Sequence, residues 1–304
     1  MIVDFSRTDS PQEYRAKVCV VGSGPVGLSI VSELIRSSRI DVILVESGAL
    51  KPQPEHELLN RTINTGDTES GLPGSRERVF GGTSTLWGGQ AIPLSPLDFE
   101  ERSWVKNSGW PLGYQDLAPY YMRAAEILEL DGTNFDLDIW EKGSGIKESI
   151  DSEKVRLTFS RWSPSPNFSK KYLKSIRKSL QVRALVNANV TELVCNKDGT
   201  AVESTVIKNL TGKTGRIRAD IFVICCGGIE NARLLLSSNS HYPNGLGNKY
   251  GKVGRYFQDH AAIYGAKLIP RNFSKFRDLF SSSFSGNQMY LPKLQNSEKR
   301  QQET

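Results

Sequence analysis

The residues with the clearest chemistry are the glycines Gly22, Gly24 and Gly27 and the acid Glu46. The glycines have the G-x-G-x-x-G spacing, which is typical of a turn that binds the pyrophosphate of a dinucleotide. Gly22 permits a tight turn, Gly24 lets the phosphates approach the backbone, and Gly27 lets a helix pack against a strand. Glu46 would accept the ribose hydroxyls and repel a 2′-phosphate, which favours FAD or NAD over NADP.

A strand, a turn, a helix and a second strand must position these residues, and residues 16–46 have this pattern. The apolar run around Val18, Val20 and Val21 predicts a buried strand, and Ser23 and Pro25 lie within the turn that follows. The helix after the turn presents free N–H groups and the positive end of its dipole to the phosphates. The second strand ends at Glu46 and Ser47.

A second glycine-rich stretch, residues 78–89, follows a long connection over residues 48–78 in which we expect one short helix. The stretch supplies accessible backbone N–H groups and small hydroxyl donors, which suit an anionic or heteroaromatic ligand that lies on the backbone. Its candidate binding residues are Arg78, Gly81, Gly82, Thr83, Ser84, Trp87 and Gly88.

The remaining patterns predict a helix over 109–130 and a third glycine site. Asp116 is the expected N-cap of that helix, and Pro119 is expected in its first turn. Residues 181–224 alternate with period two and predict a small antiparallel meander that feeds a last apolar strand. That strand runs into Gly227 and a further helix, and the carboxyl edge of a nucleotide-binding sheet would bring this junction to the same ligand.

Composition favours a soluble protein without a nucleic-acid partner. The chain has 304 residues, a net charge of +6 and 24% charged residues, and its Lys and Arg are scattered. The densest basic run, residues 170–178, fits the solvated face of an amphipathic helix. The sequence has no apolar run long enough to span a bilayer and no apolar signal core, so we expect no membrane partner and a cytoplasmic location. The four cysteines include no C-x-x-C pair, and no metal site is predicted.

With these motifs in hand, the chain resembles the glucose-methanol-choline (GMC) family of FAD-dependent oxidoreductases. The resemblance rests on VGSGPVGLSI with Glu46, FGGTSTLWGG, SGWPLGYQDLAPYYMRAAEIL, ICCGGIENARLLLSS and VGRYFQDH, which occur in the family's order over most of residues 16–260. The Thr-Ser-Thr-x-Trp wording is most similar to the sugar-oxidising branch around pyranose 2-oxidase.

The resemblance implies a role for each matching residue. Gly22, Gly24 and Gly27 would line the FAD pyrophosphate, Glu46 would bind the adenosine ribose, and residues 81–84 would lie along the pyrophosphate and flavin. The backbone of Val190 would meet the adenine, and Gly227 would lie beside the nucleotide.

Three departures from the family pattern bear on the chemistry. Members that tether FAD covalently carry a histidine where this chain has Leu86, so the resemblance implies non-covalent FAD. Trp87 stands where many members have asparagine. The family's catalytic histidine lies beyond residue 304, and His260 matches a histidine that is not the family's base, so no catalytic residue is assigned.

The expected fold is therefore α/β: a Rossmann-like FAD-binding domain with a small antiparallel meander over residues 1–265, interrupted by a helical and irregular insertion at about 96–170. Residues 266–304 would begin a truncated α+β substrate domain. The expected function is an oxidoreductase that passes hydride from a CH–OH group of an alcohol or sugar to flavin N5, inactive as this chain alone. The alternatives are a truncated, non-catalytic flavin-binding protein and, less favoured, an NAD-dependent dehydrogenase. No residue pattern indicates the substrate's identity, the electron acceptor or the oligomeric state.

Overall fold

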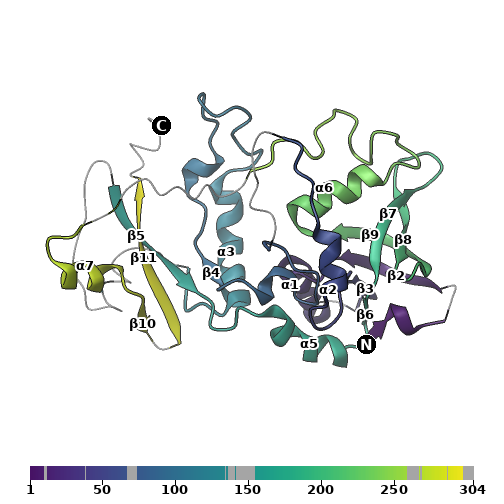
Figure 1. Cartoon of the computed structure of the whole chain (residues 1–304), viewed down its shortest axis with the longest axis horizontal. Helices are drawn as coiled ribbons and strands as arrows, with labels where there is room; N and C mark the ends of the chain where they lie inside the picture. The colour runs from purple at the N-terminus through teal and green to yellow at the C-terminus, as the bar shows by residue number, and fades with distance from the viewer. Residues whose placement is uncertain are drawn as a thin grey trace. The chain divides into compact units, whose positions relative to one another are not determined.

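The computed structural model describes residues 1–9, 12–37, 39–66, 74–133, 135, 141, 155–258, 267, 269–285 and 287–296 (Figure 1). The chain forms two compact units. The first contains Met1–Leu86 and Asn167–Ala261, and the second contains Trp87–Pro166 and Ala262–Thr304. The residues inserted into the first unit thus group with the C-terminal residues. The division of the chain into an FAD-binding and a substrate domain stays a prediction.

The first unit is built on a seven-stranded sheet with the order β1-β6-β3-β2-β9-β8-β7. Its strands are β1 (Ile2–Asp4), β2 (Gln12–Val21), β3 (Val42–Val45), β6 (Val182–Val186), β7 (Asn189–Cys195), β8 (Val202–Lys208) and β9 (Thr214–Ile224). The pairs from β1 to β9 are parallel, and β9, β8 and β7 form an antiparallel meander. The expected α/β class is confirmed.

Three parallel strands end level with one another, and this alignment creates the site. Val21 of β2 is paired with Val45 of β3 on one side and with Ile224 of β9 on the other. The residues that follow each strand therefore meet at one edge of the sheet, as expected for a parallel nucleotide-binding sheet. Helix α1 (Pro25–Ser37) starts there directly after the first glycine turn.

Helices pack against this sheet and share a hydrophobic core with its strands. The core joins Cys19 and Val21 of β2 to Ile207 of β8 and to Leu234 of α6 (Gly227–Ser237). Helix α1 contacts β2, β3 and α5 (Phe168–Lys178), whose basic residues follow the predicted amphipathic pattern. Three short elements complete the connections between strands: α2 (Pro54–Glu57), η1 (Phe5–Arg7) and η2 (Leu58–Asn60).

Two expectations about secondary structure were wrong. Residues 182–186 were expected in the antiparallel meander, but β6 lies in the parallel part of the sheet between β3 and β1. Four of its five residues are buried, since a strand in this position is covered on both faces. Helix α3 (Tyr114–Leu128) begins two residues before Asp116, with Gly113 as its N-cap. Asp116 instead reaches back from the third position to accept the N–H of Gly113 at 2.7 Å, and Pro119 lies inside the helix.

The second unit contains a four-stranded antiparallel sheet with the order β10-β11-β5-β4. Its strands are β4 (Gln90–Ala91), β5 (Val155–Trp162), β10 (Ser283–Ser285) and β11 (Gln288–Asn296). Leu157, Phe159, Leu279 and Tyr290 form its small core, to which α7 (Phe273–Phe280) contributes. The unit also holds η4 (Pro96–Phe99) and α3. Over the described part of both units, no helix has the length and apolar character needed to cross a membrane.

Candidate functional site

The first glycine turn is shaped by close backbone packing. Gly22 has a φ of +97°, and a Cβ added there would lie 2.6 Å from the carbonyl oxygen of Cys225 at the end of β9. A Cβ on Gly27 would lie 2.0 Å from the carbonyl oxygen of Gly22, so α1 sits directly against the turn. A Cβ on Gly24 would meet no heavy atom within 4 Å. At Gly22 and Gly27 the neighbouring backbone therefore leaves no room for a side chain, whereas Gly24 has open space beside it.

The second glycine segment packs onto the first. Gly81 and Gly82 have positive φ values of +107° and +51°, and they lead into η3 (Gly82–Thr85). The N–H of Gly81 donates to the carbonyl oxygen of Ser23 at 3.0 Å. A Cβ on Gly82 would lie 2.9 Å from the Cα of Gly24. Two backbone segments nearly 60 residues apart (|i−j| = 58 for Gly81 and Ser23) therefore form one continuous surface.

A cavity of about 560 Å³ opens at this edge of the sheet. This volume lies within the roughly 300–1,000 Å³ that small-molecule and cofactor sites occupy. Its wall includes most of the residues selected from the sequence: Gly22, Ser23, Gly24, Pro25, Glu46, Ser47, Arg78, Gly82, Thr83, Val190 and Gly227. The three glycine segments and the second-strand acid are thus brought to a single cavity within the first unit.

Five selected residues lie elsewhere. Gly27, Gly81 and Ser84 support the wall through backbone packing and hydrogen bonds, and the buried Ser84 hydroxyl donates to the carbonyl oxygen of Gly81 at 2.6 Å. Trp87 and Gly88 belong to the second unit. There the indole N–H of Trp87 donates to the carbonyl oxygen of Pro166 at 2.7 Å, and a Cβ on Gly88 would lie 2.1 Å from the ring of Trp162. His260 lies outside the described residues.

Glu46 is buried and also braces the first glycine turn. Its Oε2 accepts the backbone N–H of Ser23 at 3.0 Å and the Ser23 hydroxyl at 2.6 Å, and its Oε1 accepts the N–H of Gly48 at 2.8 Å. Burial raises the pKa of the Glu46 carboxyl, although these three donors and the charge of Arg78 act in the opposite direction. The carboxylate therefore faces the cavity while it holds the turn in place.

We predict that this burial gives stability a pH dependence that Glu46→Gln removes. A carboxyl whose pKa is raised on folding binds its proton more tightly in the folded state, so stability falls as pH rises through the window above the unfolded value of about 4.3. Urea unfolding between pH 4 and pH 8 should show a flatter curve for Glu46→Gln than for the wild type. Glu33→Gln, on the exterior of α1, serves as the control. Parallel curves for wild type and Glu46→Gln would contradict the prediction.

The third glycine segment closes the cavity at the end of β9. Gly227 has a φ of +81°, and added Cβ atoms on Gly227 and Gly228 would meet nothing within 4 Å. The N–H of Cys226 donates to the side-chain oxygen of Asn231 at 2.8 Å, which fixes the start of α6. Burial, together with the charges of Glu46 and Cys225, raises the pKa of the Cys226 thiol to about 12. This thiol is therefore no nucleophile at neutral pH.

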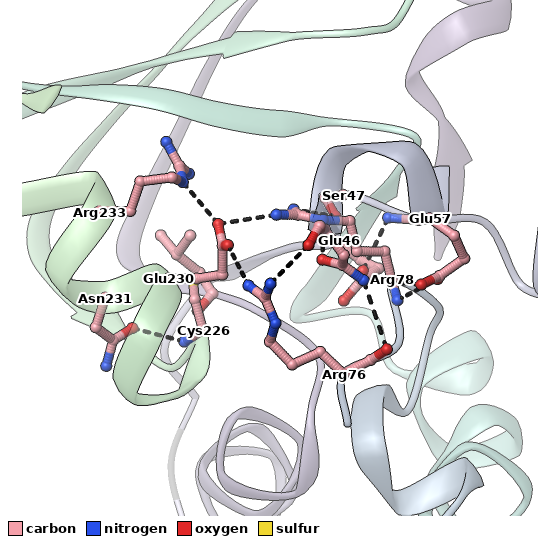
Figure 2. A network of polar contacts seen from close by, with 12 residues as sticks. Glu46, Ser47, Glu57, Arg76, Arg78, Cys226, Glu230, Asn231 and Arg233 are labelled. Atoms are coloured by element: carbon pink, nitrogen blue, oxygen red, sulfur yellow. Dashed lines mark hydrogen bonds and ion pairs between the residues drawn. The ribbon is translucent and has the colours of Figure 1, made fainter. Parts of the chain in front are cut away.

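A polar network on the cavity wall had not been expected from the sequence (Figure 2). Glu230 of α6 forms ion pairs with Arg76 at 2.7 Å, with Arg78 at 2.8 Å and with Arg233 at 2.7 Å. Asn60 holds the other side, since its carbonyl oxygen accepts from Arg76 and its side-chain oxygen accepts from Arg78, both at 2.8 Å. Of these residues, the sequence analysis selected Arg78 alone. The i,i+3 spacing of Glu230 and Arg233 was the available local signal.

The residues present fit an adenine dinucleotide such as FAD. The open positions at Gly24, Gly227 and Gly228 let a ligand lie against the backbone, where a side chain would otherwise stand. The N-terminus of the 13-residue helix α1 supplies N–H groups and a favourable dipole for the pyrophosphate. Glu46 supplies an acceptor for a ribose diol. The cavity therefore offers groups that are complementary to the pyrophosphate and to the ribose of such a ligand.

Comparison with known proteins gives related oxidases and dehydrogenases. The chain is 28% identical over 301 residues to paromamine 6′-oxidase from Streptomyces fradiae, with 78% of this chain and 52% of the relative covered. It is 25% identical over 312 residues to 2-methyl-1,2-propanediol dehydrogenase from Mycolicibacterium austroafricanum, with coverage of 83% and 56%. The chain thus spans about half the length of these relatives. These relatives are oxidases and dehydrogenases of the GMC family, and the chain matches their N-terminal portion. The predicted resemblance to this family is therefore confirmed.

Solved structures and family models add two further observations. The crystal structure of pyridoxine 4-oxidase from Mesorbium loti matches with a TM-score of 0.49 and 20% identity, over 72% of this chain and 51% of that one. No protein-family model matches the chain.

Proposed function

We propose that this chain is the FAD-binding portion of a GMC-type oxidoreductase that acts on CH–OH groups of small alcohols or sugars. The observation that carries the proposal is the single cavity to which β2, β3 and β9 bring three glycine segments and Glu46. The relatives named for paromamine and for 2-methyl-1,2-propanediol support a hydroxylated small molecule as the substrate class. The packing of Gly82 on Gly24 favours FAD over NAD, because an NAD-dependent dehydrogenase would leave the second glycine segment without a role.

Each part of the wall has a task in this proposal. Ser23, Gly24 and the start of α1 would hold the pyrophosphate, Glu46 would bind the adenosine ribose, and the backbone at Val190 would meet the adenine. Gly82 and Thr83 would lie toward the flavin. FAD supplies an electron sink when it is bound, and these residues orient it and exclude water from its adenosine half. The absence of turnover by these 304 residues alone, and a cytoplasmic location, stay predictions.

We predict that FAD binds without a covalent link. Leu86, at the end of η3, stands at the position where tethered members carry a histidine, and a leucine side chain has no atom that can bond to the flavin. Purified chain reconstituted with FAD should show flavin absorbance, and acid denaturation should release all of it into the supernatant. Flavin that stays on the precipitated chain would contradict the non-covalent claim. Failure to acquire any flavin absorbance would contradict the proposed function.

A further inference from the structure

Three arginines share one carboxylate at the wall of the cavity (Figure 2). The Glu230 side chain is 11% exposed, and it accepts from Arg76 on Oε1 and from both Arg78 and Arg233 on Oε2. The side chains of Arg76 and Arg78 are 16% and 14% exposed, whereas that of Arg233 is 49% exposed. Guanidinium groups bind phosphate in the same bidentate manner as they bind carboxylate, so Glu230 occupies donors that would suit a phosphate.

These arginines lie at the end of the cavity where Glu46 stands. Arg78 donates to the hydroxyl of Ser47, the residue after Glu46, at 3.1 Å. The charge of Arg78 also acts on the carboxyl of Glu46. In dinucleotide sites an acid at this position excludes a 2′-phosphate, whereas a nearby arginine accommodates one. The cavity wall therefore contains both an acid that would exclude a 2′-phosphate and arginines that could bind one.

Glu230 occupies the arginines with its own carboxylate, so that they are not available to a phosphate. Burial acts to raise its pKa, but the hydrogen bond from Arg233 and the charge of Arg78 hold the pKa below its usual range, so the carboxylate stays ionised. Arg76 and Arg78 are tied on their other side to Asn60. A phosphate that approached them would have to displace a paired carboxylate and would face its negative charge.

We propose that Glu230 is a specificity-determining residue, which keeps Arg76, Arg78 and Arg233 from binding a ligand phosphate. The cavity then accepts adenosine nucleotides whose ribose is unphosphorylated. This inference rests on the proposed function, because it requires a nucleotide in the cavity with its ribose near Glu46.

The test compares two probes that differ by one group, 5′-AMP and adenosine 2′,5′-bisphosphate. Their dissociation constants are measured by titration calorimetry at one fixed ionic strength, with the 304-residue chain. The wild type should prefer 5′-AMP by about tenfold or more. In Glu230→Gln the freed guanidinium groups should shift the ratio of the two constants by about tenfold toward the bisphosphate. Adding Arg76→Gln to that variant should remove most of the shift.

Two further variants serve as a charge-matched control and as a conservative substitution of Glu230. Glu77→Gln removes the same charge from the cavity wall at a residue that accepts the Thr85 hydroxyl, and its ratio should equal that of the wild type. Glu230→Asp keeps the charge but shortens the side chain, and it should give a smaller shift in the same direction even if Glu230→Gln does not fold.

Each alternative result is distinguishable. A wild type that binds the bisphosphate as well as 5′-AMP would overturn the inference. The inference would also be overturned if both Glu230 variants kept the wild-type ratio of the two dissociation constants. A lower melting temperature in those variants would then mean that the network only supports the fold. A wild type that binds neither FAD nor 5′-AMP would contradict the proposed function itself.

Discussion

Replacing Gly24 by alanine should weaken FAD binding strongly and leave the fold intact, whereas replacing Gly27 by alanine should destabilise the fold. The new methyl group at residue 24 meets no protein atom within 4 Å, but it stands in the cavity where the pyrophosphate would lie. An overpacked contact costs about 1–3 kcal/mol, so we expect roughly 5- to 150-fold weaker FAD binding.

The same substitution at residue 27 has the opposite consequence. A Cβ there would lie 2.0 Å from the carbonyl oxygen of Gly22, and the backbone of the turn cannot move away without disturbing β9. Alanine normally stabilises a helix by about 1 kcal/mol relative to glycine. At this position we expect a loss of about 3 kcal/mol instead.

Both variants are measured by urea unfolding and by FAD titration, and each is the matched control of the other. Gly24→Ala that bound FAD as tightly as the wild type would place the ligand elsewhere. Gly27→Ala with unchanged stability would contradict the packing of α1 on the turn.

The second large effect is expected in the second unit, where Arg161 of β5 is buried among aromatic rings. Its guanidinium carbon lies 5.3 Å from the centre of the Phe135 ring and 5.5 Å from that of Tyr290. Its side chain is 3% exposed, and it forms an ion pair with Asp131, which also accepts the Tyr290 hydroxyl. Burial lowers the pKa of Arg161, but an arginine stays charged at neutral pH.

Asp131→Asn should therefore destabilise this unit by about 1–3 kcal/mol, because it removes a carboxylate that pairs with the buried guanidinium and accepts the Tyr290 hydroxyl. The control is Glu126→Gln on α3, which removes a carboxylate from an exposed pair with Arg123 and should cost less than about 1 kcal/mol. Thermal and urea unfolding measure both. Equal, small losses for the two variants would mean that Asp131 contributes little to stabilising the Arg161 charge.

Local patterns with a steric cause predicted many of the residues that line the cavity, and their role in binding stays a prediction. The spacing of Gly22, Gly24 and Gly27 and the acid at the end of the second strand follow from what a tight turn and a ribose require. The helix at 114–128 was also predictable, but its start was displaced, because aspartate is favoured both at the N-cap and at the third position where Asp116 lies.

Contacts between distant segments were not predictable in the same way. Arg76 and Glu230 are 154 residues apart, and the sequence around either residue does not indicate that the two form an ion pair. Residues 182–186 alternate like an antiparallel strand, and only their position between β3 and β1 shows that both faces are covered. Strand β5 lies in the insertion that was expected to be helical and irregular, because its polar residues hide the pairing with β11.

The pairing of β2 has a consequence for synthesis on the ribosome. Its partner β3 is made soon after it, but its partner β9 begins only at Thr214, about 200 residues later. At translation rates of about 5–20 residues per second, one edge of the central strand waits roughly 10–40 s for its pairing partner. During that interval an apolar strand edge is open to association with other chains. A nascent chain that stalls before residue 224 would be released with this edge still exposed, and we expect such a chain to bind holdase chaperones.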